Sequence, residues 1–170
     1  YIVLHLVSSS STGHRLDQSY INELISSLSS RYNLQIISTP DTNHFYEDVK
    51  NLNNVHIFNG SVKEACELIS NAKLMIATDS GFRYIAYGYG IPTYTFSSHS
   101  TNPFWAIPSH QIRWLMFYET CFPLNFNLEK FCSIINNTME NKGYILAPYL
   151  QNFDTQAVRR IYSINNEKTI

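Results

Sequence analysis

The chain has 170 residues, 44% of them hydrophobic, which is enough to build one domain around a buried core. Twelve Lys and Arg against 13 Asp and Glu give a net charge of −1, so composition argues against a nucleic-acid-binding protein. The three cysteines, Cys66, Cys121 and Cys132, have no CxxC spacing. This predicts small buried thiols in a reducing compartment rather than a disulfide framework or a metal site, and no apolar run reaches the length of a membrane span.

An apolar run over residues 1–7, interrupted only by His5, predicts a first strand that helices cover on both faces, as in a parallel sheet. We interpret His5 as a structural histidine of the core or of the sheet edge. Because the chain begins at Tyr1, directly in this strand, we expect a fragment that lacks its amino-terminal part.

A hydroxyl-rich loop follows, over residues 8–15. One interpretation is a flexible linker. The other is one wall of an anion site, in which Ser8 and Ser9 offer hydroxyls and amides while His14 or Arg15 supplies positive charge. Arg15 is the better candidate of the two cations, because it is charged at neutral pH and can fork onto phosphate oxygens.

Helical periodicity and short apolar runs then alternate, as parallel α/β proteins require. Helices are expected over residues 17–30 and 45–52, and strands over residues 34–38 and 55–58. The loop after residue 38 carries Asp41, which is a candidate to bind ribose hydroxyls at the sheet edge, with a plain turn aspartate as the alternative.

Ser61 and Glu64 form an S-x-x-E capping box that predicts the start of a further helix. The expected buried face of this helix comprises Val62, Ala65, Leu68 and Ile69.

Residues 74–95, LMIATDSGFRYIAYGYGIPTYT, are the most informative stretch. The apolar run 74–78 predicts a buried strand and residues 82–87 a short helix, which two glycines end before another strand begins. Between them the turn Asp79-Ser80-Gly81 lies at the carboxyl end of its strand, where open α/β sheets bind ligands.

This turn suits an anion. The first amides of a helix have no partners within the helix, and its dipole makes that end positive. Gly81 lets a ligand approach the backbone closely, Asp79 or Ser80 caps the helix, and the Ser80 hydroxyl can donate to an oxyanion. We therefore predict a phosphate site, with a merely capped turn as the alternative.

Two aromatic segments, residues 104–108 and 112–118, predict a strand that packs on the domain, or else an interface to a missing half or to a membrane surface. Helices are expected over residues 128–141 and 155–164. The helix over residues 128–141 is expected to have an apolar stripe that comprises Leu128, Phe131, Cys132, Ile135 and Met139.

Four segments follow one another in the chain: GSVKE (60–64), LISNAKLMIATDSG (68–81), IAYG (85–88) and IPT (91–93). In this order they resemble the nucleotide-sugar half of the heptosyltransferase family, the family 9 glycosyltransferases of GT-B fold. That family has a short helix, then D-[ST]-G-x-x-H-[IL]-A, then G-x-P-T. The resemblance covers residues 1–103, and the family histidine falls on Tyr84. It implies a Rossmann-like parallel sheet with helices on both faces. Residues 1–170 would form one such domain, the C-terminal half of a GT-B enzyme.

The resemblance also implies a nucleotide diphosphate sugar across the carboxyl edge of the sheet, with no metal and no cofactor. The residues expected to contact it are Ser8, Ser9, His14 or Arg15, Asp41, Asp79, Ser80, Gly81 and Tyr84, whose hydroxyl can still donate to phosphate; Ser97 and His99 are further candidates for lining the pocket. The general base would come from the missing acceptor domain, so this chain alone is expected to bind the donor but not to transfer the sugar.

A heptosyltransferase would take ADP-heptose as donor and lipopolysaccharide core as acceptor, at the cytoplasmic face of the bacterial inner membrane. One alternative is half of a nucleotide-sugar epimerase, which needs acid–base carboxylates facing the sugar; only Asp41 and Asp79 lie near the edge. The other is a non-catalytic nucleotide-sugar-binding module.

Overall fold

The computed structural model describes residues 1–8, 18–78, 80–97, 115–119 and 128–140. Along the chain the elements are β1 (Ile2–His5), α1 (Gln18–Ser29), β2 (Leu34–Ile37), the 3-10 helix η1 (Asn43–Tyr46), β3 (Val55–Phe58), α2 (Val62–Ser70), β4 (Leu74–Thr78), α3 (Gly81–Gly88), β5 (Thr93–Ser97), β6 (Leu115–Glu119) and α4 (Leu128–Met139).

The strands form one six-stranded sheet in the order β3-β2-β1-β4-β5-β6, and every pair is parallel. This is the strand order of a Rossmann fold. β1 lies between β2 and β4, with Ile2 opposite both Leu34 and Leu74. The order of the strands reverses between β1 and β4, which is the topological switch point of the sheet. The predicted α/β class is therefore confirmed.

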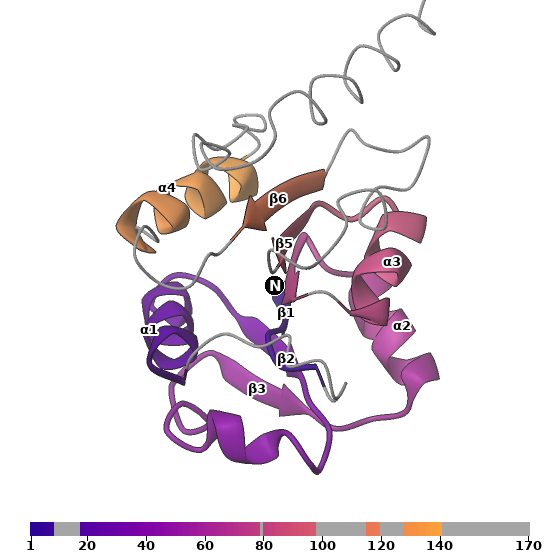
Figure 1. The fold of residues 1–170 in the computed structure, drawn as a ribbon, viewed down its shortest axis with the longest axis horizontal. Coiled ribbons are helices and arrows are strands. Elements are labelled where there is room, and N and C mark those ends of the chain that lie inside the picture. Colours follow the sequence, from indigo (N-terminus) through magenta and orange to yellow (C-terminus); the bar gives the residue numbers. More distant parts are fainter. Residues whose placement is uncertain (9–17, 79, 98–114, 120–127, 141–170) are drawn as a thin grey trace, which may run out of the picture.

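Helices cover both faces of the sheet, with α1 and α4 on one side and α2 and α3 on the other (Figure 1). Successive strand residues point to opposite faces, so each strand contributes to two cores. Ile2, Leu4 and Ile76 pack toward Phe131 of α4 in one cluster. Val3, Met75 and Ala77 pack with Ala65 and Ala86 in the other. Burial on both faces explains why these strands are continuously apolar in sequence.

The predicted capping box is present at α2. Ser61 Oγ accepts a hydrogen bond from the Glu64 N–H at 3.3 Å, and the Glu64 carboxylate accepts from the Ser61 N–H at 2.8 Å. Ala65 and Ile69 are buried as predicted, but the prediction was wrong for Val62, which is 66% exposed. Val62 is the first residue of a helix that starts at the carboxyl edge of the sheet, so no strand continues beneath it.

Replacing Ser61 with alanine should lower the free energy of unfolding by about 1 kcal/mol, because an amide of the first turn of α2 loses its acceptor. Urea unfolding measures the change. Ser70→Ala is the matched control at the other end of the same helix. There the Ser70 hydroxyl donates to the Glu67 carbonyl at 2.8 Å and accepts from Asn71 Nδ2 at 3.3 Å, but it caps no amide of the first turn. Equal losses from the two variants would contradict a specific role for the cap.

The segment between β2 and β3 differs from the prediction. Instead of a helix over residues 45–52, the chain makes the single turn η1 and then further turns. The Val49 N–H donates to the Tyr46 carbonyl at 3.1 Å and the Leu52 N–H to the Val49 carbonyl at 3.0 Å. These turns bury both Tyr46 and Val49 within the connection from β2 to β3.

The apolar stripe of α4 is confirmed: Phe131 and Ile135 are fully buried, and Leu128, Cys132 and Met139 pack against the same cluster. Cys66 and Cys132 are free thiols, but half-buried rather than buried as predicted. β6 overlaps the predicted aromatic segment 112–118 and ends one residue beyond it, at Glu119. Residues 104–108, Cys121 and the expected helix over residues 155–164 lie outside the described residues.

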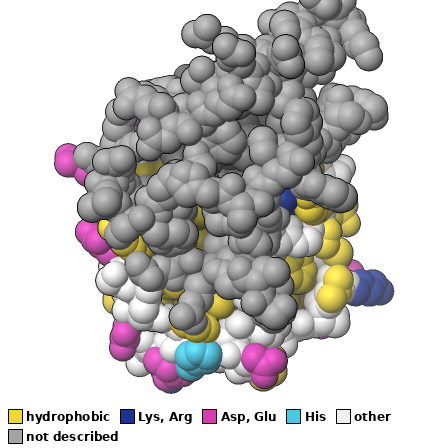
Figure 2. Space-filling model, in the orientation of Figure 1, with side chains coloured by type: hydrophobic (Ala, Val, Ile, Leu, Met, Phe, Trp, Pro, Cys, Tyr) yellow, Lys and Arg dark blue, Asp and Glu magenta, His cyan; other side chains and the backbone are white. Residues whose placement is uncertain are grey.

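Figure 2 shows one face of the molecule, on which the described acidic side chains are spread along the margin rather than gathered into a patch. This distribution fits the balanced charge of the sequence. None of the helices in the described ranges is long and apolar enough to cross a bilayer.

Candidate ligand-binding site

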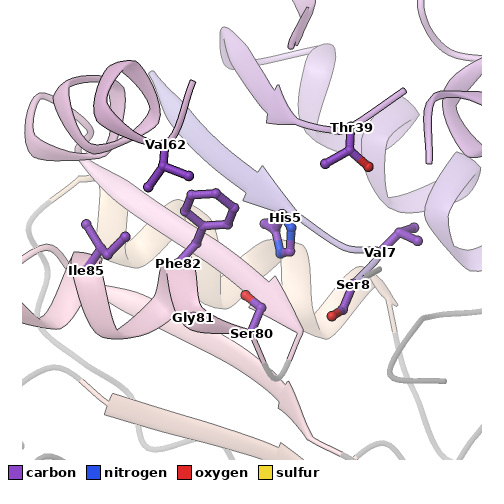
Figure 3. A pocket seen from close by; sticks show the side chains of 9 residues that line it. All are labelled: His5, Val7, Ser8, Thr39, Val62, Ser80, Gly81, Phe82 and Ile85. Carbon is purple, nitrogen blue, oxygen red and sulfur yellow. The ribbon is translucent and has the colours of Figure 1, made fainter. Parts of the chain in front are cut away.

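A cavity of about 330 Å³ opens beside the carboxyl ends of β1 and β4 (Figure 3). It therefore lies at the topological switch point, where open α/β sheets bind their ligands. The residues that line it are His5, Val7, Ser8, Thr39, Val62, Ser80, Gly81, Phe82 and Ile85.

The hydroxyl-bearing residues reach the cavity because three neighbouring parallel strands end at one edge. Ser8 follows β1, Thr39 follows β2 and Ser80 follows β4. Thr42 fixes the loop after β2, since its hydroxyl accepts from the Thr39 N–H at 2.9 Å and lies 2.9 Å from the Ser38 hydroxyl. The loop is thereby folded with Thr39, and not Asp41, on the cavity wall.

The amino-terminal end of α3 forms part of the wall. Ser80 is the N-cap residue, as predicted, but its side chain does not cap the helix. Instead, Ser80 Oγ is buried, and no partner for it lies among the described residues. Gly81 is exposed, and a Cβ built on it would meet no atom within 4 Å. The amino-terminal end of α3 is thus open at Gly81, with the Ser80 hydroxyl beside it, and an open helix amino terminus is the arrangement that binds anions.

His5 is buried as predicted, with 6% of its surface exposed, but it also lines the cavity. Its ring meets Phe82 edge-on, with the centroids 4.9 Å apart. Burial lowers the pKa of His5 to about 4, so the imidazole is neutral at pH 7. Nothing in the described part of the chain is hydrogen-bonded to its Nδ1 atom.

The rest of the wall is apolar. Val62 at the start of α2, together with Phe82 and Ile85 of α3, lies on the opposite side of His5 from Ser8 and Thr39 (Figure 3). Phe82 and Ile85 are three residues apart and so share one face of their helix. The cavity thus offers an apolar side to one part of a ligand and hydroxyls and amides to another.

The predicted site residues divide into three groups. Ser8, Ser80 and Gly81 line the cavity, whereas Asp41 and Tyr84 are exposed residues that do not line it. The Tyr84 hydroxyl instead accepts a hydrogen bond from Arg83 Nη2 at 2.8 Å. The residues Ser9, His14, Arg15, Asp79 and His99 lie outside the described part, and Ser97 is the last residue of β5.

Sequence reasoning missed six of the nine lining residues, and a signal exists for some of them. Val7 and His5 stand immediately before the serine loop, at the strand end that a switch-point site requires. Phe82 and Ile85 follow the Asp-Ser-Gly turn at helical spacing. For Val62 the capping box was the misleading signal, because it predicts a helix start but not whether a strand lies beneath it.

No protein-family model matches the sequence, and neither does any curated protein. Solved structures do match. E. coli ADP-heptose lps heptosyltransferase II superposes with a TM-score of 0.69 at 12% identity, over 83% of this chain and 46% of that one. E. coli heptosyltransferase WaaC, solved with ADP-2-deoxy-2-fluoro heptose, gives a TM-score of 0.62 at 14% identity, over 84% of this chain and 43% of that one.

A glycosyl transferase of family 9 from Veillonella parvula gives a TM-score of 0.65 at 12% identity, over 82% of this chain and 46% of that one. This chain spans less than half the length of each of these proteins. The resemblance predicted from the D-S-G and G-I-P-T motifs is thus confirmed in three dimensions: the chain has the fold found in the heptosyltransferases and other family 9 glycosyltransferases.

Proposed function

We propose that this chain is the donor-binding domain of a glycosyltransferase and that the cavity at the switch point holds a nucleotide diphosphate sugar. One observation carries the proposal: the open amino-terminal end of α3, with the Ser80 hydroxyl and Gly81 on the wall of a cavity beside β1 and β4. A diphosphate is the group that such a helix end favours.

The same contacts would assist transfer. As the bond between sugar and phosphate breaks, negative charge grows on the leaving diphosphate, and donors that bind this charge lower the barrier. We assign this role to the Ser80 hydroxyl and the first amides of α3, with Arg15 and Ser9 as further phosphate contacts. The apolar side formed by Val62, Phe82 and Ile85 would take the base.

The acceptor and its general base are assigned to a second domain, because the similar enzymes are more than twice as long as the matched region. The first candidate donor is ADP-heptose, since WaaC was solved with ADP and with an ADP-heptose analogue. The acceptor would then be a lipopolysaccharide or another glycan, reached at the cytoplasmic face of the inner membrane.

An epimerase is not favoured. Among the described residues that line the cavity none is a carboxylate, which that chemistry would need beside the sugar. A binding module without transfer activity is the second candidate, because Tyr84 stands where the similar family has histidine and its hydroxyl is engaged by Arg83.

Ligand-observed NMR of this chain with ADP, UDP, GDP and CMP tests the donor-binding role. Saturation transfer to ADP is expected, with a competition titration giving the Kd. The dispersion of the protein's own spectrum serves as the control for folding. A folded chain that binds none of the four nucleotides would overturn the donor-domain proposal.

A further inference from the structure

His5 stands at the junction between the two sides of the cavity. It ends β1, and its ring is held edge-on by Phe82. In Figure 3 the apolar side chains of Val62 and Ile85 lie beyond Phe82, while Ser8 and Thr39 lie on the other side of the imidazole and Ser80 lies close to it. A ligand that contacts both sides must therefore pass His5.

The imidazole has a polar atom to offer such a ligand. His5 is 94% buried, from an exposed fraction of 6%, and the described residues provide no hydrogen-bond partner for Nδ1. A buried polar atom without a partner is unfavourable, so most such atoms are satisfied by protein, water or ligand. Because His5 is on the cavity wall, a bound molecule is placed to supply the missing partner.

The order of groups in a nucleotide identifies which part of the ligand this is. A nucleoside diphosphate runs from base through ribose to phosphates. With the base against Val62 and Phe82 and the phosphates at Ser80 and Gly81, the ribose lies between them. We infer that His5 is a ribose-binding residue, whose Nδ1 forms a hydrogen bond with a ribose hydroxyl and so favours ribonucleotides over their deoxy forms. The inference rests on the proposed function.

The His5 imidazole and a ribose hydroxyl have complementary hydrogen-bonding groups. A neutral imidazole has one donor and one acceptor nitrogen, and a hydroxyl can both donate and accept, so the bond forms with either tautomer. A phosphate oxygen only accepts and would favour the cationic ring, which burial opposes. Asp41, the sequence-based candidate for the ribose, is exposed and off the cavity wall, which leaves this role to another residue.

The first test compares ADP with 2′-deoxy-ADP and 3′-deoxy-ADP, or the corresponding forms of whichever nucleotide binds in the panel. The unmodified chain should bind one deoxy form about tenfold more weakly, the effect of one lost hydrogen bond. His5→Leu should bring that ratio near one. His5→Asn, whose amide can occupy the position of Nδ1, should retain part of it. His56→Leu is the matched control, because His56 is an exposed histidine of β3, and its ratio should stay unchanged.

The second test needs no variant and so does not depend on how well His5→Leu folds. Nitrogen-15 spectra of the imidazoles, recorded during the ADP titration, should show the His5 signals shift while the ring stays neutral. Any of four results would overturn the inference while leaving nucleotide binding intact. Two concern affinity: equal affinity for ADP and both deoxy forms, or a ratio of ADP to deoxy-ADP affinity that His5→Leu leaves unchanged. Two concern the spectra: His5 signals that do not shift, or an imidazolium signature that indicates a phosphate contact. Failure of every nucleotide to bind would instead overturn the proposed function.

Discussion

Replacing Gly81 with valine is expected to weaken nucleotide binding at least about a hundredfold, roughly 2.7 kcal/mol, whereas valine at Gly88 should leave it unchanged. The valine side chain at Gly81 would project into the space in front of the first amides of α3, where we propose that a phosphate binds. The protein itself has room for the new side chain, because a Cβ at this position meets no atom within 4 Å. The loss would therefore come from the ligand site and not from the packing.

Gly88 makes a close control for this prediction. It ends the same helix, is exposed, and likewise has no atom within 4 Å of an added Cβ. Valine has a higher helix propensity than glycine, so neither substitution is expected to weaken the helix through propensity. NMR titration gives the Kd of both variants for the nucleotide, and circular dichroism melts show whether both variants are folded. Retained binding by Gly81→Val, or an equal loss from Gly88→Val, would place the nucleotide elsewhere on the chain.

The second large effect concerns stability at acid pH. Burial lowers the pKa of His5 from 6.5 to about 4. Above pH 6.5 the imidazole is neutral in the folded and the unfolded chain, and the stability is fully present. As the pH falls toward 4, the unfolded chain binds a proton that the folded chain does not, so the free energy of unfolding decreases. Below about pH 4 the folded chain is protonated too, and the total loss levels off at about 3 kcal/mol.

Urea unfolding between pH 7.5 and 3.5 measures this loss. Carboxylates also titrate toward the acid end of that range, so the informative quantity is the difference between the unmodified chain and His5→Asn, which has no titrating group at this position. The difference in free energy of unfolding between the unmodified chain and His5→Asn should change by about 3 kcal/mol between pH 7.5 and pH 3.5. His56→Asn provides the comparison for an exposed histidine. A constant difference between His5→Asn and the unmodified chain would show that the imidazole is not held neutral by burial.

The sequence predicted most of the elements because their signals are local. Apolar runs of strand length gave β1 and β4, and the S-x-x-E box gave the start of α2. The predicted helix over residues 45–52 was wrong for a related reason. Tyr46 and Val49 are spaced as in a helix, but three-residue spacing also fits the run of tight turns that the chain makes here.

The site was harder to predict because it depends on which strands are neighbours. The D-S-G turn and Ser8 could be identified as polar residues at strand ends, and Ser8, Ser80 and Gly81 line the cavity. His5 could not be assigned to it from periodicity, since a strand that is buried on both faces gives no sign of which residues face an opening. Asp41 and Thr39 lie in the same loop, and only the hydrogen bonds around Thr42 decide which of them reaches the cavity.

The parallel pairing of β1 with β4 has a consequence for how the chain folds. Ile2 pairs with Leu74, so a long stretch of chain, including β2, β3 and α2, must be closed into a loop before this pair can form. Contacts so distant in sequence are reached slowly, because the loss of chain entropy precedes the gain from pairing. The two halves of the cavity wall therefore meet late, and a nascent chain that has not yet released β4 from the ribosome would lack the cavity that we propose as the nucleotide site. Nucleotide added during refolding would accordingly act on the finished sheet, slowing its unfolding rather than guiding its assembly.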